Sequence, residues 1–472
     1  MYLGLDLGTS GLKALLVRED GSVAGEATAP LTVERPRPGW SEQDPASWRD
    51  ACAAACRELG DLSGVRAVGL SGQMHGATLV GGDDRALRPC MLWNDTRAHA
   101  EAAAMDDAQA RAITGNVVFP GFTAPKVEWV RRHEPEVFAA TRLVLLPKDH
   151  LRLWLTGEAW TDMSDASGTA WLDVGARDWS DAMLARSGLS RDHMPAVTEG
   201  SRVAGRIAAE AAAATGLPEG VPVAGGGGDN AASAVGVGAV APGRGFVSLG
   251  TSGVLFVSSA SYDPAPETAV HSFAHAVPGT WHQMGVILAA TDAMEWAARL
   301  TGRPAAALAS GAMRPPGRAL FLPYLGGERT PHNDAGVRGL LAGIAHATDA
   351  EAVGRAVMEG VAFAVRDCLD ALTAAGTPVD GLMAVGGGAR SDAWLEVVAT
   401  ALGRPLEVPD GASHGGALGA ARLAMMADGA GPEVAAPPPA ARVVEPAAGM
   451  ADAYAEGLAR YRRAYAAARD LA

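Results

Sequence analysis

The chain of 472 residues has only four cysteines, few aromatic residues and a deficit of basic side chains. Cys52, Cys56, Cys90 and Cys368 are too few for the disulfide framework of a secreted protein. Cys52 and Cys56 could share one helix face as half of a metal site, but no second pair or histidine follows at zinc spacing. We therefore expect buried thiols in a reduced, cytoplasmic protein.

The sequence also lacks long apolar runs and an excess of positive charge. No apolar run reaches about 18 residues, so we expect no transmembrane helix. The opening segment has no basic region and Asp6 interrupts its apolar run, which argues against a signal peptide. With 39 basic against 53 acidic residues and a net charge of −14, no nucleic-acid partner is expected. A hydrophobic fraction of 48% still excludes wholesale disorder.

One pentapeptide occurs twice, about half a chain length apart. Leu7–Gly11 and Leu249–Gly253 both read Leu-Gly-Thr-Ser-Gly, and each copy lies between two strand-like runs. In a chain with 59 glycines, chance is the alternative explanation. The shared context favours two related domains, which we expect at 1–241 and 242–472.

Local patterns predict several elements of secondary structure. Alternating leucines at 3, 5 and 7 predict a first strand, and strands are also expected at 12–17, 22–28 and 86–93. Asp44 followed by Pro45 predicts the start of a helix that runs to Leu59. The segment 427–450 is rich in alanine, proline and glycine, so we expect a surface loop there.

Such turns are suited to binding phosphate. Glycines let the backbone approach a phosphate closely, and turn amides and hydroxyls donate to its oxygens. A single turn could equally be a hairpin, whereas one in each half suggests phosphates held between domains. Neither a Walker A sequence nor a protein-kinase catalytic loop is present. Asp6, just before the first turn, could hold Mg²⁺ or its water shell, or hydrogen-bond its own turn.

Two further glycine runs follow strand-like segments and precede helical ones. Gly225–Gly228 leads to Asp229, which could cap a helix. Four glycines exceed what a cap requires, and they fit a site where a substrate must reach the backbone. Gly386–Gly388 could form a packing turn or a slot for adenine and ribose.

Several single aromatic and polar residues are further candidates for a functional site. His75 follows a strand, where a lone histidine is more often structural than functional. Trp93 stands beside polar residues, as is common where sugars are bound. Trp40 is expected to pack, and Glu328 and Arg329 could simply pair with each other.

Taken together, these segments resemble the FGGY family of carbohydrate kinases over almost the whole chain. The resemblance rests on 4–10, 39–45, 225–230, 250–252 and 386–391. It implies an α/β fold of two ribonuclease H-like domains, as in actin and hexokinase, with the active site in the cleft between them. It also implies ATP and Mg²⁺ as cofactors.

Within the family, Ser71–Gly76 resembles bacterial members that phosphorylate D-xylulose, whereas a glycerol-specific member would be expected to carry Arg-Glu-Thr here. Other segments with this likeness are 92–95, 120–126, 146–149, 162–166 and 327–332. His414 departs from the acidic residue that many relatives show. The alternatives are a kinase of ribulose, gluconate or a deoxy ketose, or a non-enzymatic actin-like ATP-binding regulator.

The resemblance assigns roles residue by residue. Asp229 would be the general base for the terminal hydroxyl, and Asp6 would hold Mg²⁺ through water. Dimers occur among relatives, so a homodimer is allowed. The phosphates would be bound by Thr9, Ser10, Gly250, Thr251 and Ser252, the sugar by Met74, His75, Trp93 and Asn230, and the nucleotide by Gly387, Gly388 and Ser391.

Overall fold

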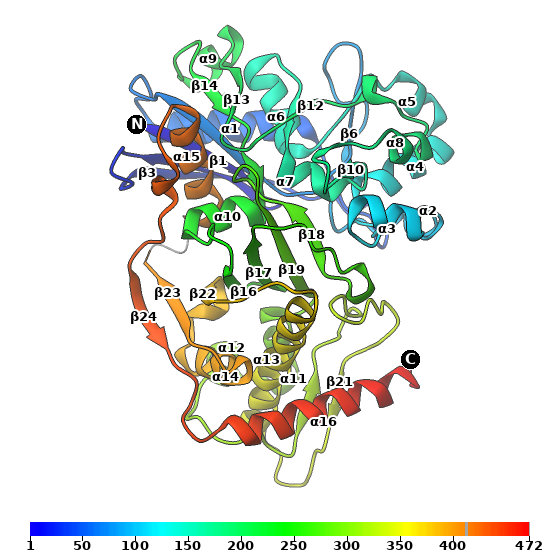
Figure 1. Cartoon of the computed structure of the whole chain (residues 1–472), viewed down its shortest axis with the longest axis vertical. Helices are drawn as coiled ribbons and strands as arrows, with labels where there is room; N and C mark the ends of the chain where they lie inside the picture. The colour runs from blue at the N-terminus through cyan, green and yellow to red at the C-terminus, as the bar shows by residue number, and fades with distance from the viewer. Residues whose placement is uncertain (411–413, 472) are drawn as a thin grey trace.

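The computed structural model describes residues 1–410 and 414–471 and contains two seven-stranded mixed sheets (Figure 1). The first sheet runs β13-β14-β5-β1-β2-β3, with β15 paired to β5, and the second runs β18-β19-β17-β16-β22-β23-β24. The repeated pentapeptide joins β1 to β2 in the first sheet and β16 to β17 in the second. The two-domain α/β fold predicted from the sequence is therefore confirmed. The two copies of the pentapeptide occupy equivalent positions, since each joins two antiparallel strands of its own sheet.

Alternating leucines build the start of the first sheet. Strand β1 (Tyr2–Leu7) buries Leu3, Leu5 and Leu7 completely, pairs antiparallel with β2 (Gly11–Val17) and runs parallel to β5 (Ala67–Gly72). The parallel register sets Asp6 opposite Ser71. These strands and the neighbouring β3 (Val23–Pro30) confirm the prediction for this region.

Helix α1 (Pro45–Leu59) packs against this sheet. It begins where predicted, because the Asp44 carboxylate accepts the backbone N–H of Ala46 and proline occupies the first turn. Trp48, Cys52 and Cys56 are fully buried on its inner face, so these two cysteines are packing residues.

The rest of the first half surrounds this sheet and extends beside it. The predicted strand at 86–93 is reduced to two residues, because most of that stretch is loop. The elements are β4 (Glu42–Gln43), β6 (Thr78–Val80), β7 (Cys90–Met91), α2 (His99–Met105), α3 (Ala108–Thr114), α4 (Thr123–His133), α5 (Pro135–Ala140), β8 (Leu143–Leu145), α6 (Pro147–Thr156), β9 (Trp160–Asp162), α7 (Met163–Ala166), η1 (Ser167–Thr169), β10 (Leu172–Asp173), β11 (Asp178–Trp179), α8 (Asp181–Arg186), η2 (Arg191–His193), β12 (Ala196–Thr198), β13 (Val203–Arg206), α9 (Ala209–Thr215), β14 (Pro222–Ala224), β15 (Gly227–Gly228) and α10 (Asp229–Val237).

The second half repeats the alternation of strands and helices, with a core of buried aliphatic side chains around the long helix α13. Its elements are β16 (Arg244–Leu249), β17 (Gly253–Ser259), η3 (Pro266–Thr268), β18 (His271–Ala274), β19 (Trp281–Ile287), α11 (Thr291–Thr301), α12 (Ala305–Leu308), β20 (Leu320–Leu322), β21 (Leu340–Ala342), α13 (Ala350–Ala374), β22 (Gly381–Val385), η4 (Gly387–Arg390), α14 (Asp392–Leu402), β23 (Leu406–Pro409), α15 (Gly415–Ala427), η6 (Pro432–Ala435), β24 (Ala440–Val444) and α16 (Ala451–Arg469).

The segment 427–450, expected from its alanine, proline and glycine content to be a surface loop, contains regular structure. Strand β24 pairs antiparallel with β23 and forms one edge of the second sheet. Its residues are largely exposed, and backbone pairing with β23 together with the strand-forming Val443 and Val444 accounts for this strand. The loop prediction was wrong for these residues.

Helix α15 belongs to the second half of the sequence but packs on the first sheet (Figure 1). Glycines make this packing very close. A Cβ on Gly4 would stand 1.9 Å from the carbonyl oxygen of Ala417, and one on Gly419 would stand 1.7 Å from that of Ala232 in α10. The two halves are therefore joined by helix packing as well as by the chain that connects them.

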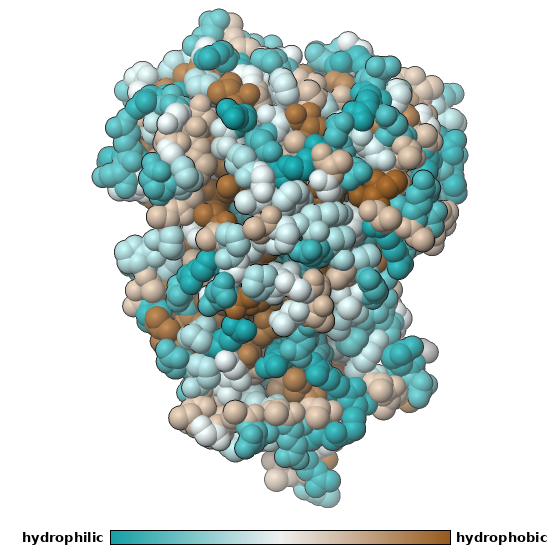
Figure 2. All heavy atoms as spheres, viewed as in Figure 1, coloured by the Kyte–Doolittle hydropathy of each residue, from teal (hydrophilic) through white to brown (hydrophobic). Residues whose placement is uncertain are grey.

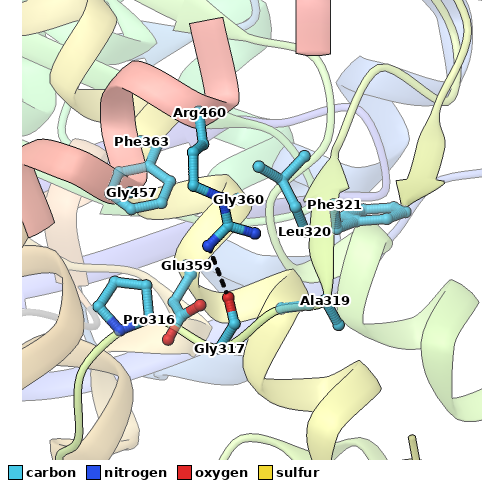
Figure 3. Close-up of a pocket in the computed structure, with 11 residues that line it drawn as sticks. Pro316, Gly317, Ala319, Leu320, Phe321, Glu359, Gly360, Phe363, Gly457 and Arg460 are labelled. Carbon is cyan, nitrogen blue, oxygen red and sulfur yellow. Dashed lines mark hydrogen bonds between the residues drawn. The ribbon is translucent and has the colours of Figure 1, made fainter. Parts of the chain in front are cut away.

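The surface shows no continuous apolar region on the face in Figure 2, where hydrophobic residues form separate small groups. Beneath α16, a pocket of only about 10 Å³ is closed by Arg460, which donates to the carbonyl oxygen of Gly317 at 3.0 Å (Figure 3). It has room for about one water molecule. Across residues 1–410 and 414–471, no helix combines the length and apolar character needed to cross a bilayer.

Candidate active site

Three cavities hold most of the residues proposed for the site; two of them are lined from both halves of the chain and one from the second half alone. The inner cavity, of about 270 Å³, is lined from both halves and brings together most residues proposed for the sugar and reacting groups. Its lining residues are Met74, His75, Trp93, Phe119, Gly121, Phe122, Asp229, Asn230, Ser248, Gly250, Ser252, Val254, His271, Phe273, Met284, Val286 and Arg329.

The second cavity, of about 200 Å³, contains the carboxylate of Asp6 and is called the Asp6 cavity. Ser248 lines both this cavity and the inner one, so the two meet at the end of β16. The Asp6 carboxylate accepts the hydroxyl of Ser71 at 2.8 Å, and burial raises the pKa of its carboxyl. A Cβ on Gly416 would lie 2.8 Å from the other Asp6 oxygen, so this glycine keeps the space beside the carboxylate open.

The third cavity, of about 660 Å³, lies where the nucleotide was expected and is called the outer cavity. Gly387, Gly388 and Ser391 line it together with α11, α12 and α14. The Ser391 hydroxyl accepts the backbone N–H of Trp394 at 3.2 Å and donates to the carbonyl oxygen of Ala309 at 2.6 Å. Ser391 thus caps α14 and fixes the wall of the cavity, which its residue type alone did not reveal.

Asp229 is the first residue of α10, as predicted, and its carboxylate faces the inner cavity. It accepts two hydrogen bonds from Asn230, one from the backbone N–H at 2.7 Å and one from the side-chain amide at 2.9 Å. Burial, assisted by the negative charge of Asp6, raises the pKa of Asp229 to about 7. A carboxylate with this pKa can take up a proton at neutral pH and release it again.

His75 is held in an unusual backbone conformation, with φ of 68°. Its Nδ1 lies 2.7 Å from the carbonyl oxygen of Gly168, and its ring stacks on Phe122 with centroids 4.7 Å apart. Burial lowers the pKa of His75 to about 3, so the ring is neutral at pH 7. Because a carbonyl only accepts, Nδ1 carries the proton and Nε2 is an acceptor.

Met74 is buried against the glycine run that precedes Asp229. A Cβ on Gly228 would come within 2.8 Å of the Met74 side chain. The last glycine of the run therefore leaves the space that Met74 fills, and sequence analysis had assigned this glycine to substrate access instead.

The first Gly-Thr-Ser-Gly turn, expected to bind phosphate, is fixed by a polar network. The Thr9 hydroxyl donates to the side-chain oxygen of Gln73 at 3.0 Å and accepts the indole N–H of Trp93 at 3.0 Å. Gln43 donates to the carbonyl oxygen of Thr9 at 2.7 Å. Thr9 is thus anchored by its neighbours, whereas Ser10 is exposed. Gln43 lies in the 39–45 motif, and its role was not recognised from the sequence.

The second Gly-Thr-Ser-Gly turn, also expected to bind phosphate, is held by hydrogen bonds to the start of α11. The carbonyl oxygen of Gly250 accepts the backbone N–H and the hydroxyl of Thr291, both at 2.8 Å, and that of Thr251 accepts the N–H of Ala290 at 2.8 Å. Thr251 is exposed, whereas Ser252 lines the inner cavity.

Arg329 is the main cavity residue that sequence analysis did not identify. Its guanidinium lies 3.5 Å from His271 Nε2 and 4.6 Å from the ring centre of Phe119. The expected pairing with Glu328 is absent from the ion pairs of the described residues, because Glu328 accepts the backbone N–H groups of Leu288 and Arg329 instead. His414 lies at the Asp6 cavity, 3.1 Å from Glu26.

Within the described part of the chain, no three His, Cys, Asp or Glu side chains are grouped to hold a metal ion. Asp6 instead offers one carboxylate to an open cavity. Mg²⁺ keeps several waters and accepts one or two carboxylates plus substrate phosphates, so this donor set fits a largely hydrated magnesium ion.

Comparisons with known proteins agree with this geometry. The chain matches the N-terminal domain of the FGGY family of carbohydrate kinases over residues 1–236 and the C-terminal domain over residues 245–427. The xylulose kinase of Escherichia coli (strain K12) is 50% identical over 436 residues, which cover 90% of each chain.

Solved structures of two related kinases superpose closely on this chain. A crystal structure of a xyloylose kinase from Brucella ovis has a TM-score of 0.97 and 54% identity, covering 100% of both chains. The xylulose kinase from Rhodospirillum rubrum has a TM-score of 0.92 and 30% identity, covering 100% of this chain and 99% of the other. With both domain models matched over most of its length, this chain belongs to the FGGY family of carbohydrate kinases.

Proposed function

We propose that this chain transfers the γ-phosphoryl group of ATP to the terminal hydroxyl of D-xylulose, forming D-xylulose 5-phosphate. The observation that carries the proposal is the Asp229 carboxyl, which faces the inner cavity with a pKa of about 7. Relatives named as xylulose kinases, at 50% and 54% identity, support the choice of sugar.

Asp229 is the general base in this proposal. The sugar hydroxyl oxygen attacks the γ-phosphorus, the bond from that phosphorus to the bridging oxygen breaks, and the hydroxyl proton goes to Asp229. An alcohol is a weak nucleophile, so alignment and proton acceptance both lower the barrier. The two hydrogen bonds from Asn230 fix the direction of the carboxylate.

The sugar occupies the inner cavity, where His75 offers Nε2 as an acceptor to a hydroxyl. Met74 and the ring of Phe122 supply apolar contact for the carbon chain. Trp93, 44% exposed, stands at the opening of the cavity, and its link to Thr9 couples the sugar side to the first phosphate turn.

The nucleotide takes the outer cavity, with Gly387 and Gly388 against the adenosine and Ser391 shaping the wall. Phosphates run towards Ser248 between the turns that carry Ser10 on one side and Gly250, Thr251 and Ser252 on the other, with Thr9 anchoring the first turn. Asp6 would hold Mg²⁺ through water, and the ion would neutralise phosphate charge.

The organisation of the chain is part of the same proposal. We place the domains at 1–241 and 242–472, since each half has its own sheet and its own turn. Because the turns stand on different sheets, sugar binding brings the halves together and excludes water. The four buried, unpaired cysteines support a reducing compartment such as the cytoplasm.

A coupled ADP-release assay with MgATP tests the assignment. The panel contains D-xylulose, D-ribulose, L-xylulose, gluconate, glycerol and a sugar-free control. D-xylulose is expected to have much the highest kcat/KM. If another polyol has the highest value, the sugar assignment to Met74 and His75 fails. If no substrate raises ADP release above the control, the kinase proposal fails.

A further inference from the structure

A cluster of five ionisable side chains lies buried beside the glycine run that leads to Asp229. Lys148, Asp149 and Arg152 come from α6, and Asp162 and Asp165 come from the β9–α7 segment; all five side chains are fully buried. Lys148 Nζ lies 2.6 Å from Asp149, 2.7 Å from Asp162 and 3.0 Å from Asp165.

The cluster is close to electrically neutral. Burial raises the pKa of Asp165, which favours a proton on this carboxyl and leaves two carboxylates for the two cations. Burying ion pairs is unfavourable because both charges lose their hydration, and apolar replacements are often at least as stable. Stability alone therefore does not explain the cluster.

The cluster is linked to both ends of the glycine run 225–228, directly through Arg152 and indirectly through Ser164, which Asp162 holds. Arg152 donates to the carbonyl oxygen of Gly225 at one end. At the other end, the Ser164 hydroxyl accepts the backbone N–H of Gly228 at 3.0 Å. Ser164 is itself fixed by Asp162, which accepts its backbone N–H at 2.8 Å and its hydroxyl proton.

The run has little freedom to shift in other directions. A Cβ on Gly225 would lie 2.3 Å from the carbonyl oxygen of Glu199, and one on Gly226 would lie 2.1 Å from that of Leu70. Gly228 immediately precedes Asp229, so the N–H that Ser164 binds belongs to the residue next to the proposed base, in the Gly227–Gly228 peptide.

We propose that Ser164 and Arg152 are positioning residues that set the place of the Asp229 carboxylate in the inner cavity. The proposal rests on the assignment of Asp229 as the base. Lys148 and Asp162 act one step further away, by orienting the Ser164 hydroxyl so that its oxygen lone pair meets the Gly228 N–H.

The Ser164→Ala variant removes the acceptor for the Gly228 N–H without touching the sugar-contacting side chains. Misplacing a reacting group by about 1 Å can cost about 10²-fold in rate. We expect kcat with D-xylulose to fall about 10- to 100-fold, with the sugar KM within about threefold of wild type.

Ser187→Ala is the matched control. Ser187 is also fully buried and its hydroxyl also accepts an N–H, from the indole of Trp171 at 2.9 Å, but it does not contact the glycine run. Both variants leave one buried N–H without its partner, and thermal unfolding of both reports any shared loss of stability. A kcat for Ser164→Ala that matches Ser187→Ala would overturn the proposal.

A double-mutant cycle separates positioning from a general structural effect. If Ser164 acts through Asp229, Ser164→Ala lowers kcat in the wild type but adds less than about twofold in the Asp229→Asn background. An equal loss in both backgrounds would contradict it. If Asp229→Asn itself keeps wild-type kcat, the base assignment fails, and that outcome is distinct from failure of the positioning role.

Discussion

The negative charge of Asp6 adds to the burial that raises the pKa of Asp229, although the two carboxylates stand on different elements and line different cavities. Asp6 is the residue before the last in β1, whereas Asp229 begins α10. The two cavities meet at Ser248, so the groups face one reaction space from two directions.

This relationship predicts the pH dependence of the reaction. Asp229 accepts a proton only when ionised, so kcat/KM for the sugar should fall about tenfold per pH unit below about pH 7 and level off above it. His75, with a pKa of about 3, stays neutral between pH 5 and pH 9, so its titration does not change kcat/KM in that range. The measurement is the profile of kcat/KM from pH 5 to pH 9.

Asp6→Asn tests whether the charge of Asp6 contributes to the raised pKa of Asp229. Removing the negative charge stabilises the ionised form of Asp229, so its pKa falls and the midpoint of the profile moves to lower pH. The rate falls at every pH as well, because Asp6 is the carboxylate proposed to hold Mg²⁺ through water. The midpoint of the kcat/KM profile is determined separately from its maximum value, so this loss does not obscure the shift. An unmoved midpoint would show that the two carboxylates are not coupled.

Gly168→Ala should disturb His75. The added Cβ would stand 2.4 Å from the His75 ring, which must then move away from the carbonyl that fixes its Nδ1 proton. We expect the KM for D-xylulose to rise at least about tenfold, corresponding to one lost hydrogen bond of about 1.4 kcal/mol.

Gly82→Ala serves as the control for that substitution, because no atom lies within 4 Å of its added Cβ. Sugar affinity measured by titration calorimetry should be unchanged in Gly82→Ala and weakened in Gly168→Ala. Equal affinity in the two variants would remove His75 from the sugar site.

Arg329→Met should weaken sugar binding more than it slows catalysis. Among the described residues the guanidinium has no ion-pair partner, and it lines the inner cavity beside His271. A hydrogen bond from a charged donor contributes about 1.5–3 kcal/mol, so the sugar KM should rise by about 10- to 100-fold. An unchanged KM, with the surface variant Arg191→Met as reference, would place Arg329 outside the sugar contacts.

Local patterns explain which parts were predictable from sequence. The alternation of Leu3, Leu5 and Leu7 and the Asp44-Pro45 start of α1 depend on near neighbours, and both were confirmed. The repeated turn identified the two halves because its glycines and hydroxyls are read directly from the chain. The resemblance to a family then assigned some of the residues that line the three cavities.

Features that depend on distant packing were not predictable in this way. Arg329 reaches the inner cavity because the next residue, Thr330, bonds to Val286 on β19. Helix α15 reaches the first sheet only because Gly4 and Gly69 have no Cβ. Lys148, which the sequence places only in the 146–149 segment of family likeness, is buried because carboxylates from a separate segment surround it.

The most direct test of the account is the rate of ADP release with D-xylulose by wild type and Asp229→Asn. We expect Asp229→Asn to lose about 10²–10⁴-fold in kcat, while the Kd for D-xylulose from titration calorimetry stays close to wild type. Asp178→Asn, an exposed carboxylate paired with Arg191, is the control and should keep full activity. An Asp229→Asn enzyme with wild-type kcat, or one that loses sugar affinity in proportion to its rate, would contradict the role of Asp229 as the base.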